Sequence, residues 1–292
     1  MISTRSKSAS LAITTLLSAV CSTSPPFVFP SFTHSPVDWV VSGGWDNAVK
    51  VWDVNTEAEN APLHVYSLPG KVYAMDVTRD GCVRVLPLTY SNLLVALENR
   101  QIAVCNLHSL TTPPVLRESL LKFNLRCIRA LLDGSGYVVG SIEGRAGVEF
   151  LAESAANKPF SFRCHRKPDA FGAEVIYPVN AIAVHPMWEK GGKLTSRYGS
   201  FATGGSDGSV SIWDAVAKKR LAYFTKWASC SRFTRSYTPG VVCLAFNRDG
   251  TKLAIASSYM FEQGPGSASV ELPSSVAIRS IKEEDVVFKS VA

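Results

Sequence analysis

Short runs of alternating apolar and polar residues recur along the chain. In the clearest run, Val210 and Ile212 alternate with Ser209 and Ser211, which is the period of a half-buried β-strand. Turn-forming pairs such as Asp-Gly and Asp-Asn come before these runs, and they suit tight hairpin turns. No long helical pattern competes with this one. The pattern therefore predicts an all-β chain of short hairpin-connected strands.

A repeated motif indicates how these strands are organised. Segments 42–53 and 203–214 both run from small residues through a turn containing Asp to an alternating strand that ends in Trp-Asp. Trp52 follows Asp46 by six residues, and Trp213 has the same place in the second copy. Strands that end in Trp-Asp are typical of WD repeats, which form the blades of β-propellers.

We therefore predict a WD-repeat β-propeller in residues 27–292, preceded by an unmatched extension in residues 1–26. About five blades are expected, each of four strands. The expected strands are 27–33, 39–44, 48–54 and 63–68; 72–77, 93–97, 101–107 and 115–123; 126–131, 137–141, 147–151 and 160–165; 179–185, 200–205, 209–214 and 221–224; 241–247, 252–257, 275–281 and 286–291. Segments 189–198, 226–239 and 263–269 are expected to be loops.

Composition narrows the class of protein. The 292 residues are 46% hydrophobic and 18% charged, which permits a sizeable core and argues against wholesale disorder. The net charge of +6 fits an acidic partner, although a mildly basic soluble protein explains it equally well. The seven cysteines are odd in number and none has the C-x-x-C spacing. This favours a reduced compartment, the cytosol or nucleus.

The N-terminal segment leaves a choice open. Arg5 and Lys7 precede an apolar run over 11–21, which resembles a secretory signal or a transit peptide. The scattered odd cysteines argue against secretion, and the segment is more simply an extension without function. No apolar stretch is long enough to span a bilayer, so no membrane partner is expected.

Several longer segments give the chain a specific resemblance. They are 44–53 (Gly-Trp-Asp-Asn through Trp-Asp), 117–119 (Arg-Glu-Ser), 126–130 (Arg-Cys-Ile-Arg-Ala), 141–145 (Ser-Ile-Glu-Gly-Arg), 162–166 (Phe-Arg-Cys-His-Arg), 176–182 (Ile-Tyr-Pro-Val-Asn-Ala-Ile), 218–221 (Lys-Lys-Arg-Leu) and 253–260 (Leu-Ala-Ile-Ala-Ser-Ser-Tyr-Met). On these segments the chain resembles the Bub/Rae family of WD-repeat propellers. It is closer to the spindle-checkpoint branch than to the mRNA-export branch, on segments 176–182 and 218–221.

The resemblance also implies a departure from the family. Family members have seven blades and close the ring by pairing an N-terminal strand with the last blade, whereas this chain matches only the last five blades. An open arc would expose two sheet edges, which favours aggregation. We expect either an incomplete coding sequence, which we favour, or closure as a five-bladed ring.

Three arginines are the candidate binding residues. Arg126 begins the first strand of the third blade, Arg145 lies at the next hairpin turn, and Arg166 follows the fourth strand. In a propeller these places point to the same end of the ring. A guanidinium offers a planar fork of donors that suits carboxylate or phosphate, so the three predict a reader of acidic or phosphorylated peptides. Ordinary surface charges are the alternative.

The resemblance assigns ligands to these arginines. It implies that they bind Glu-containing GLEBS segments of a checkpoint kinase and its pseudokinase relative, and phosphothreonine MELT motifs of an outer-kinetochore scaffold. Trp45 and Lys219 are possible accessory contacts, whereas Trp52 and Trp213 are expected in the core. A further basic contact that the family takes from its first blade has no counterpart here, so the resemblance implies phosphopeptide binding without that contact.

Catalysis is not expected. His165 lies beside Cys164, but no third ligand or catalytic partner stands at a useful spacing. No phosphate-binding glycine loop, nucleophile elbow or paired-carboxylate motif is present. We therefore expect no metal and no cofactor.

Four functional hypotheses remain. The first is a spindle assembly checkpoint adaptor in the nucleus and at mitotic kinetochores. The second is an mRNA-export adaptor that binds a nuclear-pore protein and RNA, supported by basic residues at Lys190, Lys193, Arg197, Arg232 and Arg235. The third is a cullin-ligase receptor, which the absence of Arg two residues after each Trp-Asp argues against. The fourth is a silent gene product.

Overall fold

A computed structural model of the chain describes eleven stretches of the sequence. These are residues 27–28, 39–53, 61–79, 90–152, 158–169, 171–186, 189–190, 193–194, 200–225, 240–259 and 274–287. The expected extension over residues 1–26 and the expected loops 226–239 and 263–269 lie outside them.

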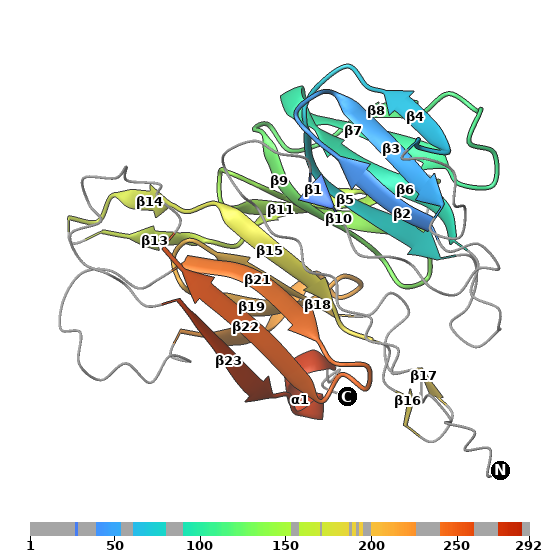
Figure 1. Cartoon of the computed structure of the whole chain (residues 1–292). Coiled ribbons are helices and arrows are strands. Elements are labelled where there is room, and N and C mark those ends of the chain that lie inside the picture. Colours follow the sequence, from blue (N-terminus) through green and yellow to red (C-terminus); the bar gives the residue numbers. More distant parts are fainter. Residues whose placement is uncertain are drawn as a thin grey trace, which may run out of the picture.

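Five antiparallel sheets follow one another along the chain as the blades of a propeller (Figure 1). Their strands are β1 (Phe27–Val28), β2 (Trp39–Gly43), β3 (Ala48–Asp53) and β4 (His64–Ser67); β5 (Val72–Arg79), β6 (Tyr90–Leu97), β7 (Gln101–Asn106) and β8 (Val115–Glu118); β9 (Leu125–Ala130), β10 (Gly136–Ser141), β11 (Arg145–Phe150) and β12 (Phe160–Arg163); β15 (Val179–Val184), β18 (Ser200–Gly205), β19 (Val210–Asp214) and β20 (Lys219–Phe224); β21 (Gly240–Phe246), β22 (Lys252–Ser258) and β23 (Ser275–Ser280). The expected all-β propeller is confirmed.

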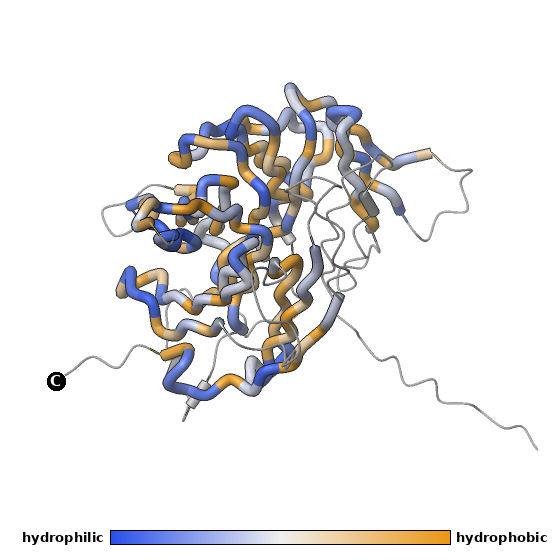
Figure 2. Tube along the Cα trace, turned by 90° about the vertical axis from the view of Figure 1, so that its left-hand side faces the viewer, coloured by the Kyte–Doolittle hydropathy of each residue, from blue (hydrophilic) through white to orange (hydrophobic). Residues whose placement is uncertain are grey.

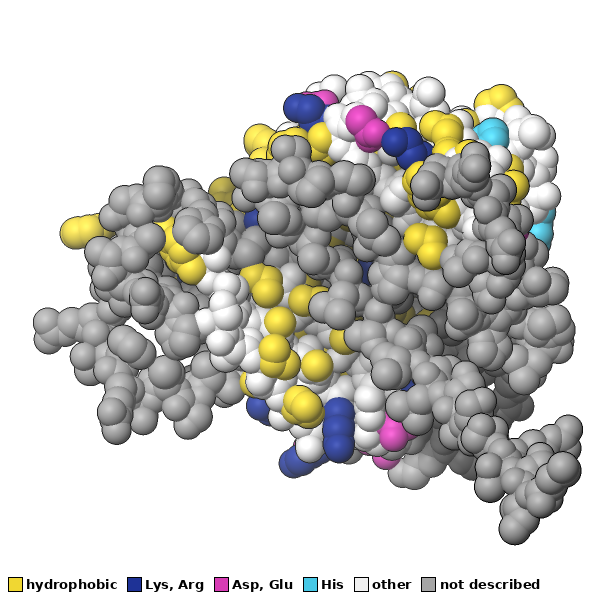
Figure 3. Space-filling model, viewed as in Figure 1, with side chains coloured by type: hydrophobic (Ala, Val, Ile, Leu, Met, Phe, Trp, Pro, Cys, Tyr) yellow, Lys and Arg dark blue, Asp and Glu magenta, His cyan; other side chains and the backbone are white. Residues whose placement is uncertain are grey.

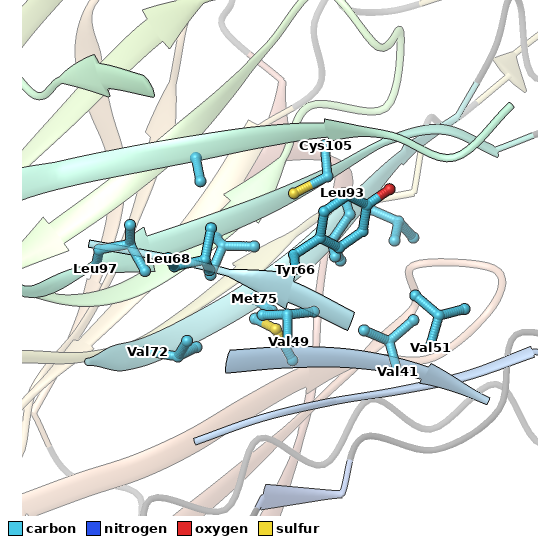
Figure 4. Packing of buried hydrophobic residues seen from close by; sticks show 13 residues of the cluster. Val41, Val49, Val51, Tyr66, Leu68, Val72, Met75, Leu93, Leu97 and Cys105 are labelled. Atoms are coloured by element: carbon cyan, nitrogen blue, oxygen red, sulfur yellow. The ribbon is translucent and has the colours of Figure 1, made fainter. Parts of the chain in front are cut away.

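The core lies between adjacent sheets. Figure 4 shows one such layer, in which Val49, Val51 and Tyr66 of the first sheet pack with Leu93 and Leu97 of the second. Equivalent layers join the second sheet to the third, the third to the fourth and the fourth to the fifth. Hydrophobic and hydrophilic residues alternate along the strand traces (Figure 2). The alternation in the sequence therefore reflects strands that each bury side chains against a neighbouring sheet.

A glycine near the end of the second strand allows the next sheet to come close. A Cβ atom on Gly140 would lie 2.8 Å from Val179 Cγ1, and one on Gly204 would lie 2.4 Å from Val241 Cγ1. Both valines belong to the first strand of the following sheet. The small residues that precede the turn in the repeat are thus required by packing between blades.

A β-bulge recurs near the start of the first strand in four sheets. In β9, Leu125 pairs with Ser141 and Cys127 with Gly140, which makes Arg126 the extra residue. The extra residues of β5, β15 and β21 are Tyr73, Asn180 and Val242. A bulge redirects the side chain it carries. These four side chains are therefore placed at the same end of their sheets.

Several expected elements differ from the structure. The expected strand over 286–291 is wrong at its start, because helix α1 (Glu283–Val286) occupies that position; residues 288–292 lie outside the described part. The hydrogen bond from the Lys282 amide to Asp285 Oδ2 favours the helical turn. The expected loop 189–198 contains the strand pair β16 (Glu189–Lys190) and β17 (Lys193–Leu194). A further hairpin, β13 (Arg166–Pro168) with β14 (Glu174–Ile176), was not expected.

Candidate functional site

One end of the third sheet carries a cluster of arginines. Strands β9 and β11 begin at this end, and β10 and β12 finish there, because all four pair antiparallel. The structure thus brings the expected Arg126 and Arg145 to the same end of the sheet, and Arg166 begins β13 just beyond β12. Together with Arg163, the last residue of β12, they are called the arginine cluster below.

Arg145 and Arg163 are cross-strand neighbours. They pair directly between β11 and β12, and the Arg145 Nη2 donates a hydrogen bond to Ser161 Oγ at 3.2 Å. The Arg163 side chain is 66% exposed, and its Nη1 lies 3.6 Å from Glu174 Oε1. Like charges directly opposite one another destabilise a sheet, so this pair favours an acidic group bound beside it.

The sequence reasoning missed Arg163. The residue stands inside the segment 162–166 that carried the resemblance, but only Arg166 of that segment was singled out as a binding residue. Its importance comes from the register of β11 with β12, which places it against Arg145.

Arg166 is largely committed to the fold. Its Nε and Nη2 donate to the Glu143 carbonyl oxygen at 3.1 and 2.9 Å, and its Nη1 donates to Glu174 Oε2 at 2.8 Å. Its side chain is only 13% exposed. Arg166 therefore ties the β10–β11 turn to the β13–β14 hairpin, whereas Arg163 offers the more accessible charge.

The two expected accessory residues, Trp45 and Lys219, belong to different sheets, and only Trp45 lies at the end that corresponds to the arginine cluster. Trp45 lies on the turn between β2 and β3, 48% exposed, with Lys71 Nζ 5.6 Å from its ring centroid. The β10–β11 turn beside Arg145 is at the equivalent end of the third sheet. Lys219 begins β20, where β19 ends, which is the other end of the fourth sheet. The structure therefore places Lys219 apart from the arginine cluster.

A buried polar network supports the chain between the third and fourth sheets. His165, fully buried, has Nδ1 2.9 Å from Asp207 Oδ1 and Nε2 3.0 Å from Thr203 Oγ1. Trp213 Nε1 donates to the same Thr203 oxygen at 3.0 Å. His165 is therefore an interior anchor next to Arg166. The two expected core tryptophans are half-buried, and Trp52 donates to Ser42 Oγ at 2.8 Å.

The Asp207 carboxylate is the acidic member of this network. Burial alone would raise its pKa, but hydrogen bonds from His165 and Ser209 and the nearby charge of Lys167 hold that pKa well below its ordinary value. The Lys167 Nζ lies 3.1 Å from Asp207 Oδ2. The network thus fixes Lys167, and the bonds to the Glu143 carbonyl fix Arg166, so both residues that begin β13 are bound to the propeller.

Metal-binding groups and membrane-spanning helices were also sought among the described residues. Over those stretches, no group of three or more His, Cys, Asp or Glu side chains is placed to hold a metal ion. In the same stretches, no helix has the length and apolar character needed to cross a membrane.

Comparisons with known proteins place the chain among WD-repeat proteins. A family model described as "WD domain, G-beta repeat" matches residues 33–53 and 177–214. The chain is 38% identical to the mitotic checkpoint protein BUB3.1 of Arabidopsis thaliana, over 85% of this chain and 64% of the relative. It is 32% identical to the mitotic checkpoint protein bub3 of Dictyostelium discoideum, over 87% of this chain and 67% of the relative.

An RNA-export protein is also similar. The chain is 34% identical to the poly(A)+ RNA export protein of Schizosaccharomyces pombe, over 86% of this chain and 61% of the relative. The chain therefore spans about two thirds of the length of the relatives it matches.

Proposed function

Because this chain belongs to the Bub/Rae family of WD-repeat proteins, we propose that it is a non-enzymatic adaptor that binds acidic peptide segments at the arginine cluster. The observation that carries the proposal is the direct pairing of Arg145 with Arg163, with Arg126 on the β9 bulge at the same end of the sheet. Guanidinium groups held at one end of a rigid sheet suit carboxylate or phosphate oxygens. An acidic or phosphorylated peptide segment is a ligand that fits such a group of arginines.

The proposed partners follow the spindle-checkpoint branch. Relatives from Arabidopsis and Dictyostelium are named mitotic checkpoint proteins, which supports a checkpoint role for this chain. The proposed ligands are GLEBS segments of checkpoint kinase and pseudokinase partners, and phosphothreonine motifs of an outer-kinetochore scaffold. The proposed location is the nucleus, with recruitment to kinetochores in mitosis.

An RNA-export adaptor is the second candidate. It is favoured by the similarity to the poly(A)+ RNA export protein. It predicts binding to single-stranded RNA that weakens steeply with added salt, together with a nuclear-pore protein partner. No retention of RNA at low salt would remove this candidate.

A fluorescence-anisotropy titration tests the peptide adaptor. A labelled GLEBS-type peptide is titrated with the full chain, with Arg145→Ala, and with Lys219→Ala as a control that removes the same charge at the other sheet end. Loss of a charge-assisted hydrogen bond should weaken binding about 10-fold or more in Arg145→Ala, with little change in the control. Failure of the folded wild-type chain to bind, or unchanged binding in both Arg126→Ala and Arg145→Ala, contradicts the proposal.

A further inference from the structure

A small hairpin projects from the connection between the third and fourth sheets. Strands β13 and β14 pair antiparallel as a two-stranded sheet of their own, with Arg166 opposite Ile176 and Pro168 opposite Glu174. In Figure 1 this hairpin extends to the left of the blades that it connects. It is an addition to the blade pattern, and the core layers do not require it.

The tip of the hairpin presents an aromatic side chain to solvent. Phe171 is 96% exposed. Two backbone amides of this turn are nevertheless held in place, because Asp169 Oδ1 accepts hydrogen bonds from the amides of Phe171 and Ala173, both at 2.8 Å. Gly172 has φ +84°, which glycine adopts without strain. The turn is thus preorganised, although its aromatic ring contributes almost nothing to the fold.

The base of the hairpin is fastened to the arginine cluster. Arg166 begins β13 and is bonded to the Glu143 carbonyl, while Glu174 on β14 lies between Arg166 and Arg163. The Tyr177 amide donates to the His165 carbonyl at 3.0 Å where the hairpin returns to the propeller. The tip therefore has a fixed place relative to the arginines.

The hairpin surface combines apolar and basic character. Ile176, 46% exposed, is the cross-strand neighbour of Arg166, so apolar surface begins beside the cluster. Figure 3 shows hydrophobic side chains at the outer end of the hairpin, at the left edge of the molecule. From Arg166 to Asp169 the chain runs extended for three residue steps, or roughly 10 Å, and the turn with the Phe171 side chain adds to this distance. A bound extended peptide covers the same distance with about four or five residues.

We propose that the β13–β14 hairpin is a second contact of the peptide site, where Phe171 packs on an apolar side chain of the acidic segment held by the arginine cluster. This inference rests on the proposed function. The recognised segment then carries an aliphatic or aromatic residue about four or five positions from its acidic residue. A rigid aromatic tip is suited to this role, because little conformational freedom is lost when it binds.

A double-mutant cycle tests the contact. The chain, Phe171→Ser and the exposed control Val276→Ser are each titrated with the labelled GLEBS-type peptide and with variants in which each apolar residue in turn is replaced by Ser. We expect Phe171→Ser to weaken binding about fivefold and Val276→Ser to leave it unchanged. At one peptide position, replacement by Ser should weaken binding to the wild-type chain. The same peptide change should cause no further loss of affinity for the Phe171→Ser variant, because the contact is already gone.

The outcomes separate this inference from the proposed function. If Arg145→Ala weakens binding while Phe171→Ser does not, the hairpin contact is overturned and the arginine site stands. If the wild-type chain binds no peptide, both are overturned. A dimer in sedimentation velocity that Phe171→Ser converts to monomer would assign the tip to a second copy of the chain and overturn the peptide contact. Unchanged thermal unfolding of Phe171→Ser confirms that the variant is folded.

Discussion

At the scale of single residues, Asp207 and His165 show how an interior charge can stabilise the propeller. The Asp207 carboxylate accepts hydrogen bonds from the Ser209 amide at 3.1 Å and the Ser209 hydroxyl at 2.6 Å, and it lies 2.9 Å from His165 Nδ1. Removing the carboxylate takes a hydrogen-bond partner from the buried His165 and Ser209 side chains, which costs about 1–3 kcal/mol for each group left unsatisfied.

We expect Asp207→Ala to lower the free energy of unfolding by about 3 kcal/mol, measured by urea denaturation. The surface variant Glu284→Ala should change the free energy of unfolding by less than about 0.5 kcal/mol.

The wild type should also lose stability in acid. The folded pKa of Asp207 lies below its ordinary value of 3.8, so its contribution is present above that value and is lost as the pH falls below it. Equal stability of both variants at neutral pH would contradict this role.

Glu149 is a second buried carboxylate, with the opposite shift. Burial raises its pKa, although hydrogen bonds from Ser119, the Leu120 amide and Tyr137 oppose the rise. The distances from these three donors to the carboxylate oxygens are 2.5, 3.2 and 3.2 Å. This side chain links strand β8 of the second sheet to the third sheet, since Ser119 directly follows β8.

Glu149→Gln should therefore become relatively more stable than the wild type as the pH rises from 4 to 7. A carboxyl with a raised folded pKa contributes stability below its ordinary value of 4.5, and that stability is lost as the pH rises through the folded pKa. Gln cannot ionise, so the variant should lack this loss. Chemical denaturation at several pH values measures the difference, and two parallel stability curves would refute the assignment.

At the scale of elements, the regular blade strands could be predicted from the sequence, whereas the elements that depart from the blade pattern could not. The β18–β19 hairpin was evident because Val210 and Ile212 alternate with serines after a turn. The β13–β14 hairpin was missed because each strand has only three residues and one of them is Pro168. Arg126 was identified by its place in a strand, but its bulge depends on the register with β10, which the sequence of β9 alone does not contain.

The same hairpin carries a carboxylate that neutralises part of the arginine cluster. Glu174 Oε2 lies 2.8 Å from Arg166 Nη1, and Glu174 Oε1 lies 3.6 Å from Arg163 Nη1. A bound acidic residue would compete with Glu174 for these guanidinium groups. We expect Glu174→Gln to strengthen binding of an acidic peptide about two- to threefold, which is the modest effect of an exposed ion pair. Anisotropy titration measures this effect, with Glu284→Gln as the control. Weaker binding in Glu174→Gln would contradict this competition and show that the ion pairs of Glu174 with the arginines support binding.

At the scale of the whole molecule, stability comes from the layers between sheets, and each sheet depends on its neighbours. The repeat alone predicted these layers, because strands with one apolar face cannot bury it within a single blade. In the sequence, the glycines that let adjacent sheets approach closely could be recognised only as small residues before a turn. The structure shows why glycine is needed there: the first strand of the next sheet packs against it, as Val241 packs against Gly204.

The outermost described strand of the fifth sheet, β23, exposes apolar side chains. Within the described residues this sheet has three strands, and no strand pairs with the outer side of β23. Val276 and Ile278 on β23 are 71% and 70% exposed. An exposed apolar edge strand offers free backbone donors and acceptors to another chain, and a charged side chain on the edge blocks such pairing.

We therefore expect the chain of residues 1–292 to self-associate as its concentration rises, and Ile278→Lys to shift it toward monomer. Sedimentation velocity over a concentration series measures both. Val216→Lys adds the same charge at a 52% exposed position that follows β19, outside any strand, and should leave association unchanged. A wild-type chain that stays monomeric throughout the series, or equal effects of both lysines, would show that association does not use this edge. Arg145 belongs to the third sheet, so peptide affinity per chain should be the same in Ile278→Lys and in the wild type.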